Sequence, residues 1–327
     1  MAGVSQATVS QVIRGTNTVS EAVEARVRSS ILALGYVPNP LARGLKGANT
    51  GLFGVVARDI SMPTTTLMIS SLVREARARG YEVVVADTGE SAPAALHLAR
   101  LMKEQLCDGV AFVGDLQDEH LLWEGYEQVG LRAVGLLQGN RQLPISNVTV
   151  DNILGGKLAL DHLTSLGHHR IAFVGAGWIH AIRERTQAFL DYPGVGEKAV
   201  SMGYLLETPN RAQAGAEALA ALWHRDDRPT AIFAATDVIA TGLLARAHEL
   251  HVSVPAALSI IGFDDSPMSA HLVPALTTVH QPTELLARSA MDILTDSRRQ
   301  RTKRTRVHVI PPDLVLRAST ASPPDTS

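Results

Sequence analysis

The sequence is poor in cysteine, in aromatic residues and in long apolar runs. Cys107 is the only cysteine among 327 residues, which excludes an internal disulfide and a cysteine-based metal cluster. Aromatic residues make up 4% of the chain and apolar residues 46%, so the core must be aliphatic. No basic-then-apolar leader opens the chain, and no run of about 18 apolar residues occurs in it. We therefore expect a cytoplasmic protein without a membrane-spanning segment.

Charge is distributed unevenly along the chain. The formal net charge is −2. Residues 1–49 hold five basic and two acidic side chains, a balance of +3, which leaves −5 for the remainder. A basic head on an acidic body is expected when only the head meets a polyanion, although so small an excess also arises by chance.

A short helix is predicted at the start of the chain. Ser5 suits its N-cap, and Val9, Val12 and Ile13 form one apolar stripe at helical spacing. Its opposite face carries small, amide and basic side chains and no acidic one, namely Gln6, Ala7, Ser10, Gln11 and Arg14. Amide and arginine side chains can pair with base edges in the major groove. This face is either a DNA-reading surface or an ordinary solvated helix face.

A second helix is predicted after a turn at residues 15–18. Ser20 can cap it and Gly35 can end it. Its apolar stripe consists of Val23, Val27, Ile31 and Leu34. Such a helix pair is weak evidence of function when it is taken alone.

The body begins at Thr50 and alternates short apolar runs with helical segments. Strands are predicted at 52–57, 82–86, 109–114, 130–138, 171–174, 230–235 and 258–262. Helices are predicted at 68–79, 94–106, 184–190 and 238–250, and a further helix follows the segment 148–152 and runs through Leu163. The alternation restarts near residue 148, so it predicts two parallel sheets with helices on both faces.

Several motifs together resemble one protein family over nearly the whole chain. The head contains AGVSxxTVSxV, VSExxxxRV and LGYxPNxxAR, with a leucine two places further on. The body contains matching segments at 148–175, 233–249, 254–265, 274–282 and 311–320. In these features the chain resembles the lactose-repressor/galactose-repressor family of bacterial transcription regulators.

The resemblance implies an α/β fold with two doubly wound parallel-sheet subdomains, similar to periplasmic sugar-binding proteins, and a small all-α helix-turn-helix head. It implies a partial head at 1–37, a hinge helix or linker at 38–49, an effector-binding core at 50–320 and a disordered tail at 321–327. The first subdomain is expected at about 50–149 and 281–310, and the second at about 150–280 and 311–320.

The head departs from the family pattern in one respect. The family's first helix should precede Ala2 and pack on the recognition helix, and it is absent from this sequence. We interpret Met1 as an internal methionine of a longer product; the alternative is a head that folds poorly. The resemblance implies DNA contacts by Ser5, Gln6, Ala7, Thr8, Ser10, Gln11 and Arg14, with Leu45 of the hinge as a wedge in the minor groove.

The effector site is predicted beyond the carboxyl ends of the strands, where open α/β sheets bind ligands. By the resemblance, Arg185 matches an arginine that holds a ligand oxygen, and Asp264 matches a carboxylate that takes ligand hydroxyls or ring N–H groups. Alternatively, these two side chains form a structural ion pair. Asp59, Thr236 and Trp178 complete the expected effector-binding set.

The expected effector site lacks most of the family's aromatic side chains. Residues 61–65 read Ser-Met-Pro-Thr-Thr where the family usually has a segment like Asn-Pro-Phe-Phe, and Thr236 stands where Asn is usual. Trp178 is the one large ring nearby. The effector is therefore an unusual sugar, a smaller polar metabolite, or absent.

Three other motifs are discounted. The glycines at 175 and 177 lack the third glycine of a dinucleotide fingerprint. His168 and His169 lack a third metal ligand at helical spacing, so we expect a role at a helix C-terminus. The basic run at 298–306 is expected to be a solvated loop, with a second nucleic-acid contact as the alternative. No nucleophile elbow is present, and we expect no catalytic residue, metal or cofactor.

The sequence therefore predicts a DNA-binding transcription regulator, a repressor, controlled by a small polar effector such as a sugar. We expect a homodimer on a palindromic operator, with no membrane partner. Two other classes stay open: a sugar- or solute-binding protein without DNA contact, and an enzyme that uses the cleft.

Overall fold

The computed structural model describes residues 2–14, 19–35, 50–105, 107–175, 177–296 and 305–324. The chain divides into two compact units, a head of Met1–Thr50 and a core of Gly51–Ser327. The hinge at 38–49, with Leu45, and residues 298–304 of the basic run lie outside the described residues. Among the helices that are described, none is both long and apolar enough to cross a membrane.

The head contains two short helices, α1 (Gln6–Arg14) and α2 (Glu21–Ala33). The predicted cap of α1 is confirmed, because the Ser5 hydroxyl accepts a hydrogen bond from the Thr8 backbone N–H at 3.2 Å. Val12 of α1 and Val27 of α2 are 4% and 1% exposed, and the two helices contact each other. The predicted apolar stripes therefore supply the side chains that these helices bury.

Two expectations about α2 are wrong. Ser20 occupies the N-cap position but makes no capping hydrogen bond through its side chain. Leu34, expected on the apolar stripe, is 68% exposed, because α2 ends at Ala33 and Leu34 is its C-cap.

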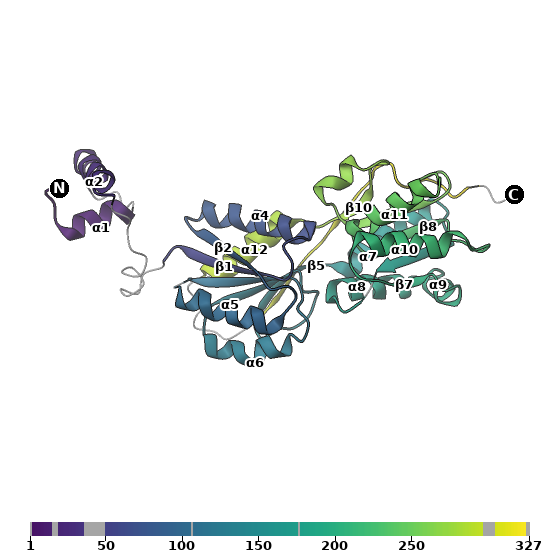
Figure 1. Cartoon of the computed structure of the whole chain (residues 1–327), viewed down its shortest axis with the longest axis horizontal. Coiled ribbons are helices and arrows are strands. Elements are labelled where there is room, and N and C mark those ends of the chain that lie inside the picture. The colour runs from purple at the N-terminus through teal and green to yellow at the C-terminus, as the bar shows by residue number, and fades with distance from the viewer. Residues whose placement is uncertain are drawn as a thin grey trace. The chain divides into compact units, whose positions relative to one another are not determined.

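The first sheet of the core has the order β2-β1-β3-β4-β5-β11, with every pair parallel. Its strands are β1 (Leu52–Ala57), β2 (Glu82–Asp87), β3 (Gly109–Val113), β4 (Ala133–Leu136), β5 (Ser146–Val150) and β11 (Val307–Ile310). Helices α4 (Pro63–Ala78) and α12 (Thr283–Thr295) cover one face, and α5 (Ala92–Glu104) and α6 (His120–Val129) cover the other (Figure 1).

The second sheet has the order β7-β6-β8-β9-β10-β12, parallel except for the β10–β12 pair. Its strands are β6 (Ile171–Gly175), β7 (Leu205–Glu207), β8 (Ala231–Ala234), β9 (Ser259–Asp264), β10 (Thr277–His280) and β12 (Asp313–Val315). Its helices are α7 (Asn152–Ser165), α8 (His180–Leu190), α9 (Gly196–Ser201), α10 (Ala212–Trp223), α11 (Asp237–Glu249) and the 3₁₀ turn η1 (Pro267–His271).

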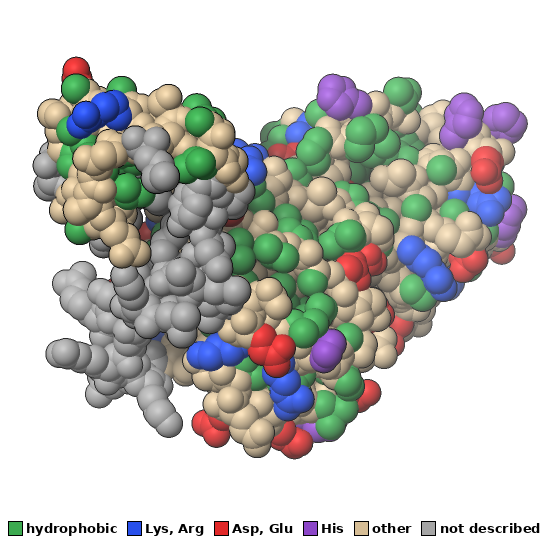
Figure 2. Space-filling model, turned by 60° about the vertical axis from the view of Figure 1, so that its left-hand side comes forward, with side chains coloured by type: hydrophobic (Ala, Val, Ile, Leu, Met, Phe, Trp, Pro, Cys, Tyr) green, Lys and Arg blue, Asp and Glu red, His purple; other side chains and the backbone are tan. Residues whose placement is uncertain are grey.

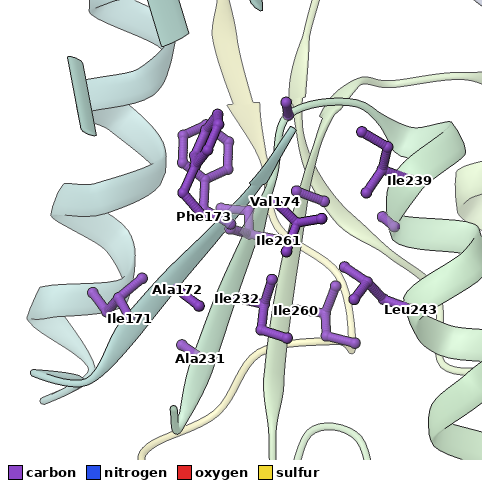
Figure 3. Packing of buried hydrophobic residues seen from close by; sticks show 14 of the residues in the cluster. Ile171, Ala172, Phe173, Val174, Ala231, Ile232, Ile239, Leu243, Ile260 and Ile261 are labelled. Atoms are coloured by element: carbon purple, nitrogen blue, oxygen red, sulfur yellow. The ribbon is translucent and has the colours of Figure 1, made fainter. Parts of the chain in front are cut away.

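Strands β6, β8 and β9 of the second sheet are buried along their whole length, as parallel strands covered on both faces must be. Ile232 and Ile260 on neighbouring strands lie beside Ile239 and Leu243 of α11 (Figure 3). Helices α10 and α11 pack closely because Gly242 has no side chain: a Cβ there would lie 1.7 Å from the Ala212 carbonyl oxygen. The predicted aliphatic core and the α/β fold class are both confirmed.

The chain crosses between the two sheets three times, at 150–152, 280–283 and 310–313. The crossings leave the carboxyl edges of the two sheets joined by short segments. The helix predicted at 68–79 begins earlier, since α4 starts at Pro63. Proline is tolerated there because the first helical position needs no hydrogen bond from its nitrogen.

The histidine pair and the C-terminal tail also differ from expectation. The His168 N–H bonds the Leu163 carbonyl at the end of α7, but its ring is buried, with Nδ1 2.9 Å from Thr230 Oγ1. Its Nε2 donates to the Ala321 carbonyl oxygen at 2.8 Å, and Ala321 N donates to Ser259 Oγ at 3.0 Å. The chain is therefore still docked on the core at residue 321, where the tail was expected to begin.

Candidate functional site

A cleft lies where the carboxyl edges of the two sheets come together. In each sheet the chain changes the direction in which it adds strands, between β1 and β3 in the first sheet and between β6 and β8 in the second. Open α/β sheets bind ligands at the carboxyl ends of the strands beside such switch points. The cavity volume of the cleft is about 60 Å³, and residues of both sheets line it. The lining includes the first residues of four helices, α4, α7, α8 and α11. None of the described lining residues is aromatic.

Arg185 of α8 and Asp264 at the end of β9 meet in this cleft. Arg185 Nη1 lies 3.6 Å from Asp264 Oδ1, and the two side chains are 3% and 4% exposed. The guanidinium also donates from Nε to Asn152 Oδ1 at 3.0 Å and from Nη1 to the Ala235 carbonyl oxygen at 2.6 Å. Its carbon stacks 3.5 Å from the centre of the Phe263 ring. The ion pair that the sequence offered as an alternative is thus present in the structure.

Asp264 contacts both walls of the cleft. Besides Arg185, its carboxylate accepts hydrogen bonds from Gln281 Nε2 at 2.6 Å and from the side chain of Thr64 on α4 of the first sheet. Its backbone φ is +126° and that of Asp265 is +54°. Such conformations are strained for residues other than glycine and are typical of functional sites.

Burial determines the electrostatics of the cleft. Burial lowers the pKa of Arg185 to about 10, although the negative charge of Asp264 acts to raise it. Burial also raises the pKa of Asp264, although the positive charge of Arg185 acts to lower it. Asp237 lies beside this pair, and burial together with the charge of Asp264 raises its pKa to about 7. Its carboxylate accepts hydrogen bonds from Ser266 N at 2.8 Å, from Ser269 Oγ and from Thr278 Oγ1 at 2.6 Å.

We expect Asp237 to make the core less stable as the pH rises. An aspartate whose pKa is raised by folding adds stability that is present below its unfolded pKa, 3.8, and is lost as the pH rises through the folded value of about 7. Between about pH 5 and about pH 8 this loss amounts to about 2–3 kcal/mol. Urea unfolding of the wild type and of Asp237→Asn at both pH values measures it. An equal pH dependence in the two proteins would contradict the assignment to Asp237.

Two further carboxylates join the sheets beside the cleft. Asp115, after β3, accepts hydrogen bonds from His180 N at 2.9 Å and from Arg141 Nη2 at 2.8 Å, and burial raises its pKa to about 6. Glu184 of α8 accepts from Asn140 N at 2.5 Å and from Asn152 Nδ2 at 2.7 Å. The first turns of α8 are therefore bonded to loops of the first sheet.

The other predicted effector residues divide into two groups. Thr236 lines the cleft; its hydroxyl donates to Asn210 Oδ1 at 2.6 Å and accepts the Ile239 N–H at 3.4 Å, which caps α11. Asp59 is not among the lining residues, because its carboxylate accepts both the N–H and the hydroxyl of Ser61 in its own loop. Trp178 is also outside the lining and is 36% exposed.

Sequence reasoning missed several polar side chains of the cleft, among them Arg58, Asn152 and Gln281. Each follows a strand end directly or by one residue, at β1, β5 and β10. All three positions satisfy the rule that ligands bind beyond the carboxyl ends of the strands. The rule does not say which of two adjacent residues faces the ligand, and we therefore predicted Asp59 in place of its neighbour Arg58.

The predicted DNA contacts lie on α1 and its N-cap. Ser5, Gln6 and Ala7 are exposed, and Thr8, Ser10 and Gln11 are half-buried. Arg14 is the last residue of α1, and its side chain, like Leu45, is outside what the structure describes. The DNA-contact assignment stays a prediction.

The described residues contain no group of three or more His, Cys, Asp or Glu side chains that could hold a metal ion. The cleft presents two arginines, a carboxylate, amides and hydroxyls, which suit a polar ligand.

Comparison with known proteins identifies the family. Residues 160–320 match the periplasmic binding protein-like domain, and residues 1–39 match the bacterial regulatory proteins of the lacI family. The transcriptional regulator DegA of Bacillus subtilis is 30% identical over 324 residues, which cover 98% of this chain and 96% of DegA.

Two solved structures resemble the whole chain. The Lac repressor dimer bound to operator and the anti-inducer ONPF has a TM-score of 0.80 at 24% identity, with 98% of this chain and 96% of that chain covered. The complex of the transcriptional regulator CelR with cellobiose has a TM-score of 0.71 at 28% identity, with 97% of each chain covered. The fold of nearly the whole chain therefore recurs in these proteins. By its likeness to DegA and the match of its head, the chain belongs to the lacI family of bacterial regulatory proteins.

Proposed function

We propose that this protein is a repressor that binds a palindromic operator as a homodimer and changes its DNA affinity when a small polar effector occupies the cleft. The observation that carries this proposal is the combination of a lacI-family head with a core cleft in which buried, complementary polar groups contact both walls. The relatives are transcription regulators, and we assign no catalysis to the cleft and place the protein in the cytoplasm.

The head supplies the DNA contacts in this proposal. On the face shown in Figure 2, the described acidic and basic side chains of the core are interspersed, and such a surface attracts a polyanion weakly. A helix-turn-helix head reads one half-site, so a palindromic site requires two copies of the chain. CelR binds cellobiose in its solved structure, which supports a sugar or a related metabolite as the effector of this chain.

Selection from random DNA tests the proposal. The full-length protein should enrich a two-fold symmetric site, and the affinity should fall steeply with salt because basic side chains displace counterions from DNA. Binding should respond to at least one member of a panel of sugars and polar metabolites. Failure to enrich any site would leave a solute-binding protein, and turnover of a panel member would indicate an enzyme.

Gln11, a half-buried residue of α1, gives a prediction about a single base pair. Replacing Gln11 by alanine should cost about 1–3 kcal/mol at one base pair of each half-site and should relax specificity there, because an amide pairs with a particular base edge. The measurement is a competition gel shift with single-base variants of the selected site. A uniform loss across all base variants would show that Gln11 contacts the phosphates instead.

A further inference from the structure

Arg58 is a buried cation in the cleft to which the described residues offer no hydrogen bond or salt bridge at its side chain. It follows β1, lines the cleft and is 8% exposed. Its Nε is buried and has no hydrogen-bond partner, and no salt bridge to the guanidinium is found among the described residues. Its guanidinium carbon lies 5.7 Å from the centre of the Trp178 ring, which is at the outer limit of a cation–π contact.

Arg185, the other arginine in the described lining of the cleft, differs from Arg58 because its guanidinium has hydrogen-bond and ion-pair partners. Arg185 has Asn152, Ala235 and Asp264 as partners. The charge of Arg58 influences Asp115, but that carboxylate already accepts hydrogen bonds from Arg141 and His180. A buried charge without a partner is costly, so a partner from outside the chain is the simplest explanation for its presence.

The surroundings of Arg58 favour a negatively charged partner. Helix α4 points its first residues, Pro63, Thr64 and Thr65, into the same cleft, and its N-cap Met62 makes no capping hydrogen bond through its side chain. The unsatisfied N–H groups of a helix start bind anions. Gly114 leaves room for the arginine, since a Cβ there would lie 3.2 Å from Arg58 Cβ and 3.7 Å from Nε.

We propose that the effector carries an anionic group, a carboxylate or a phosphate, and that Arg58 and the start of α4 bind it. This inference rests on the proposed effector cleft and narrows its ligand to an acidic polyol, such as a sugar acid or a sugar phosphate. Arg58 pairs with the anionic group, and Asp264, which keeps Arg185 as its counter-ion, accepts hydrogen bonds from the hydroxyl groups. No aromatic side chain is found among the described lining residues, which agrees with recognition by charge and hydrogen bonds rather than by stacking.

The first test needs no ligand. In the full-length protein Arg58→Met should raise the melting temperature by at least about 2 °C, because it removes a buried charge without a partner. Arg100→Met, the same change at an exposed position on α5, should shift it by less than about 1 °C. A lower melting temperature for Arg58→Met would show that Arg58 stabilises the fold itself, and the inference would be wrong.

The second test uses matched ligands. Glucose, glucuronate and glucose 6-phosphate, with ribose and ribose 5-phosphate, are titrated by calorimetry into the wild type, Arg58→Met and Arg100→Met. At least one acid should bind about tenfold or more tightly than its neutral parent, and Arg58→Met should erase that difference while Arg100→Met keeps it. The carboxylate and phosphate members identify which anion is bound.

The outcomes separate this inference from the proposed function. Neutral sugars that bind as tightly as the acids, with binding lost in Asp264→Asn and kept in Arg58→Met, would retain the effector cleft and overturn the anionic effector. An acid preference that persists in Arg58→Met would also overturn it. The absence of binding by every acid in the panel would count against it in the same way.

Discussion

Replacing Asp264 by asparagine should lower the free energy of unfolding of the core by about 3 kcal/mol, the lower end of the range for breaking a buried ion pair. The substitution keeps the shape of the side chain, so the strain of the positive φ at this position should be the same in both proteins. It leaves the 3%-exposed Arg185 without its carboxylate. Asp237 offsets part of the loss, because its pKa is raised by the charge of Asp264 and should fall when that charge is removed.

Urea unfolding of four proteins measures this effect. They are the wild type, Asp264→Asn, Arg185→Met and the double variant. The double variant should be more stable than the sum of the single losses indicates, because it removes both charges and leaves neither buried alone. Additive losses would show that the 3.6 Å separation between Arg185 and Asp264 carries little coupling energy.

The same variant addresses the effector. Asp264→Asn removes an acceptor that reaches both walls of the cleft through Thr64 and Arg185. It should therefore still bind operator but lose its response to the effector, provided that the assay temperature lies below its melting temperature. A ligand shifts a conformational equilibrium only by its difference in affinity for the two states. An undiminished response would place the effector elsewhere.

The parts of the fold that the sequence predicted are those with a strong local pattern. Strands β1, β6 and β8 are short apolar runs bounded by turn residues, and their boundaries lie within one residue of the prediction. The edge strands β7, β11 and β12 carry half-buried or exposed side chains and give no such signal. Their place in the sheets depends on tertiary contacts with β6, β5 and β10.

The candidate site was predictable only in part for a related reason. The rule that ligands bind at the carboxyl edge of the sheet gives the edge but not the direction of each side chain. It therefore led to Asp59 and not to Arg58. The pairing of Arg185 with Asp264 followed from the family resemblance, because no periodicity links residues on different elements. The buried Nε of Arg58, which has no hydrogen-bond partner among the described residues, and the buried carboxylate of Asp237 are properties of packing. They appear only when the sheets are assembled.

Replacing Val27 by aspartate should abolish specific operator binding, a loss of at least about 10³ in affinity, since specific sites are bound that much more tightly than random DNA. Val27 is 1% exposed and belongs to the contact between α1 and α2. A carboxylate at this position would be placed in the buried contact between the two helices, where a charge is costly. Such short helices depend on their mutual packing for stability.

The stability of the core should not change in this variant, because the head is a separate compact unit and substitutions at distant, independent sites act additively. The melting temperature of the core and its effector binding should equal those of the wild type, while the operator complex disappears from a gel shift. Ala25→Asp, which adds the same single negative charge at an exposed neighbouring position of α2, is the matched control and should weaken DNA binding far less. Equal losses for the two variants would indicate that added negative charge, and not the packing of Val27, is responsible.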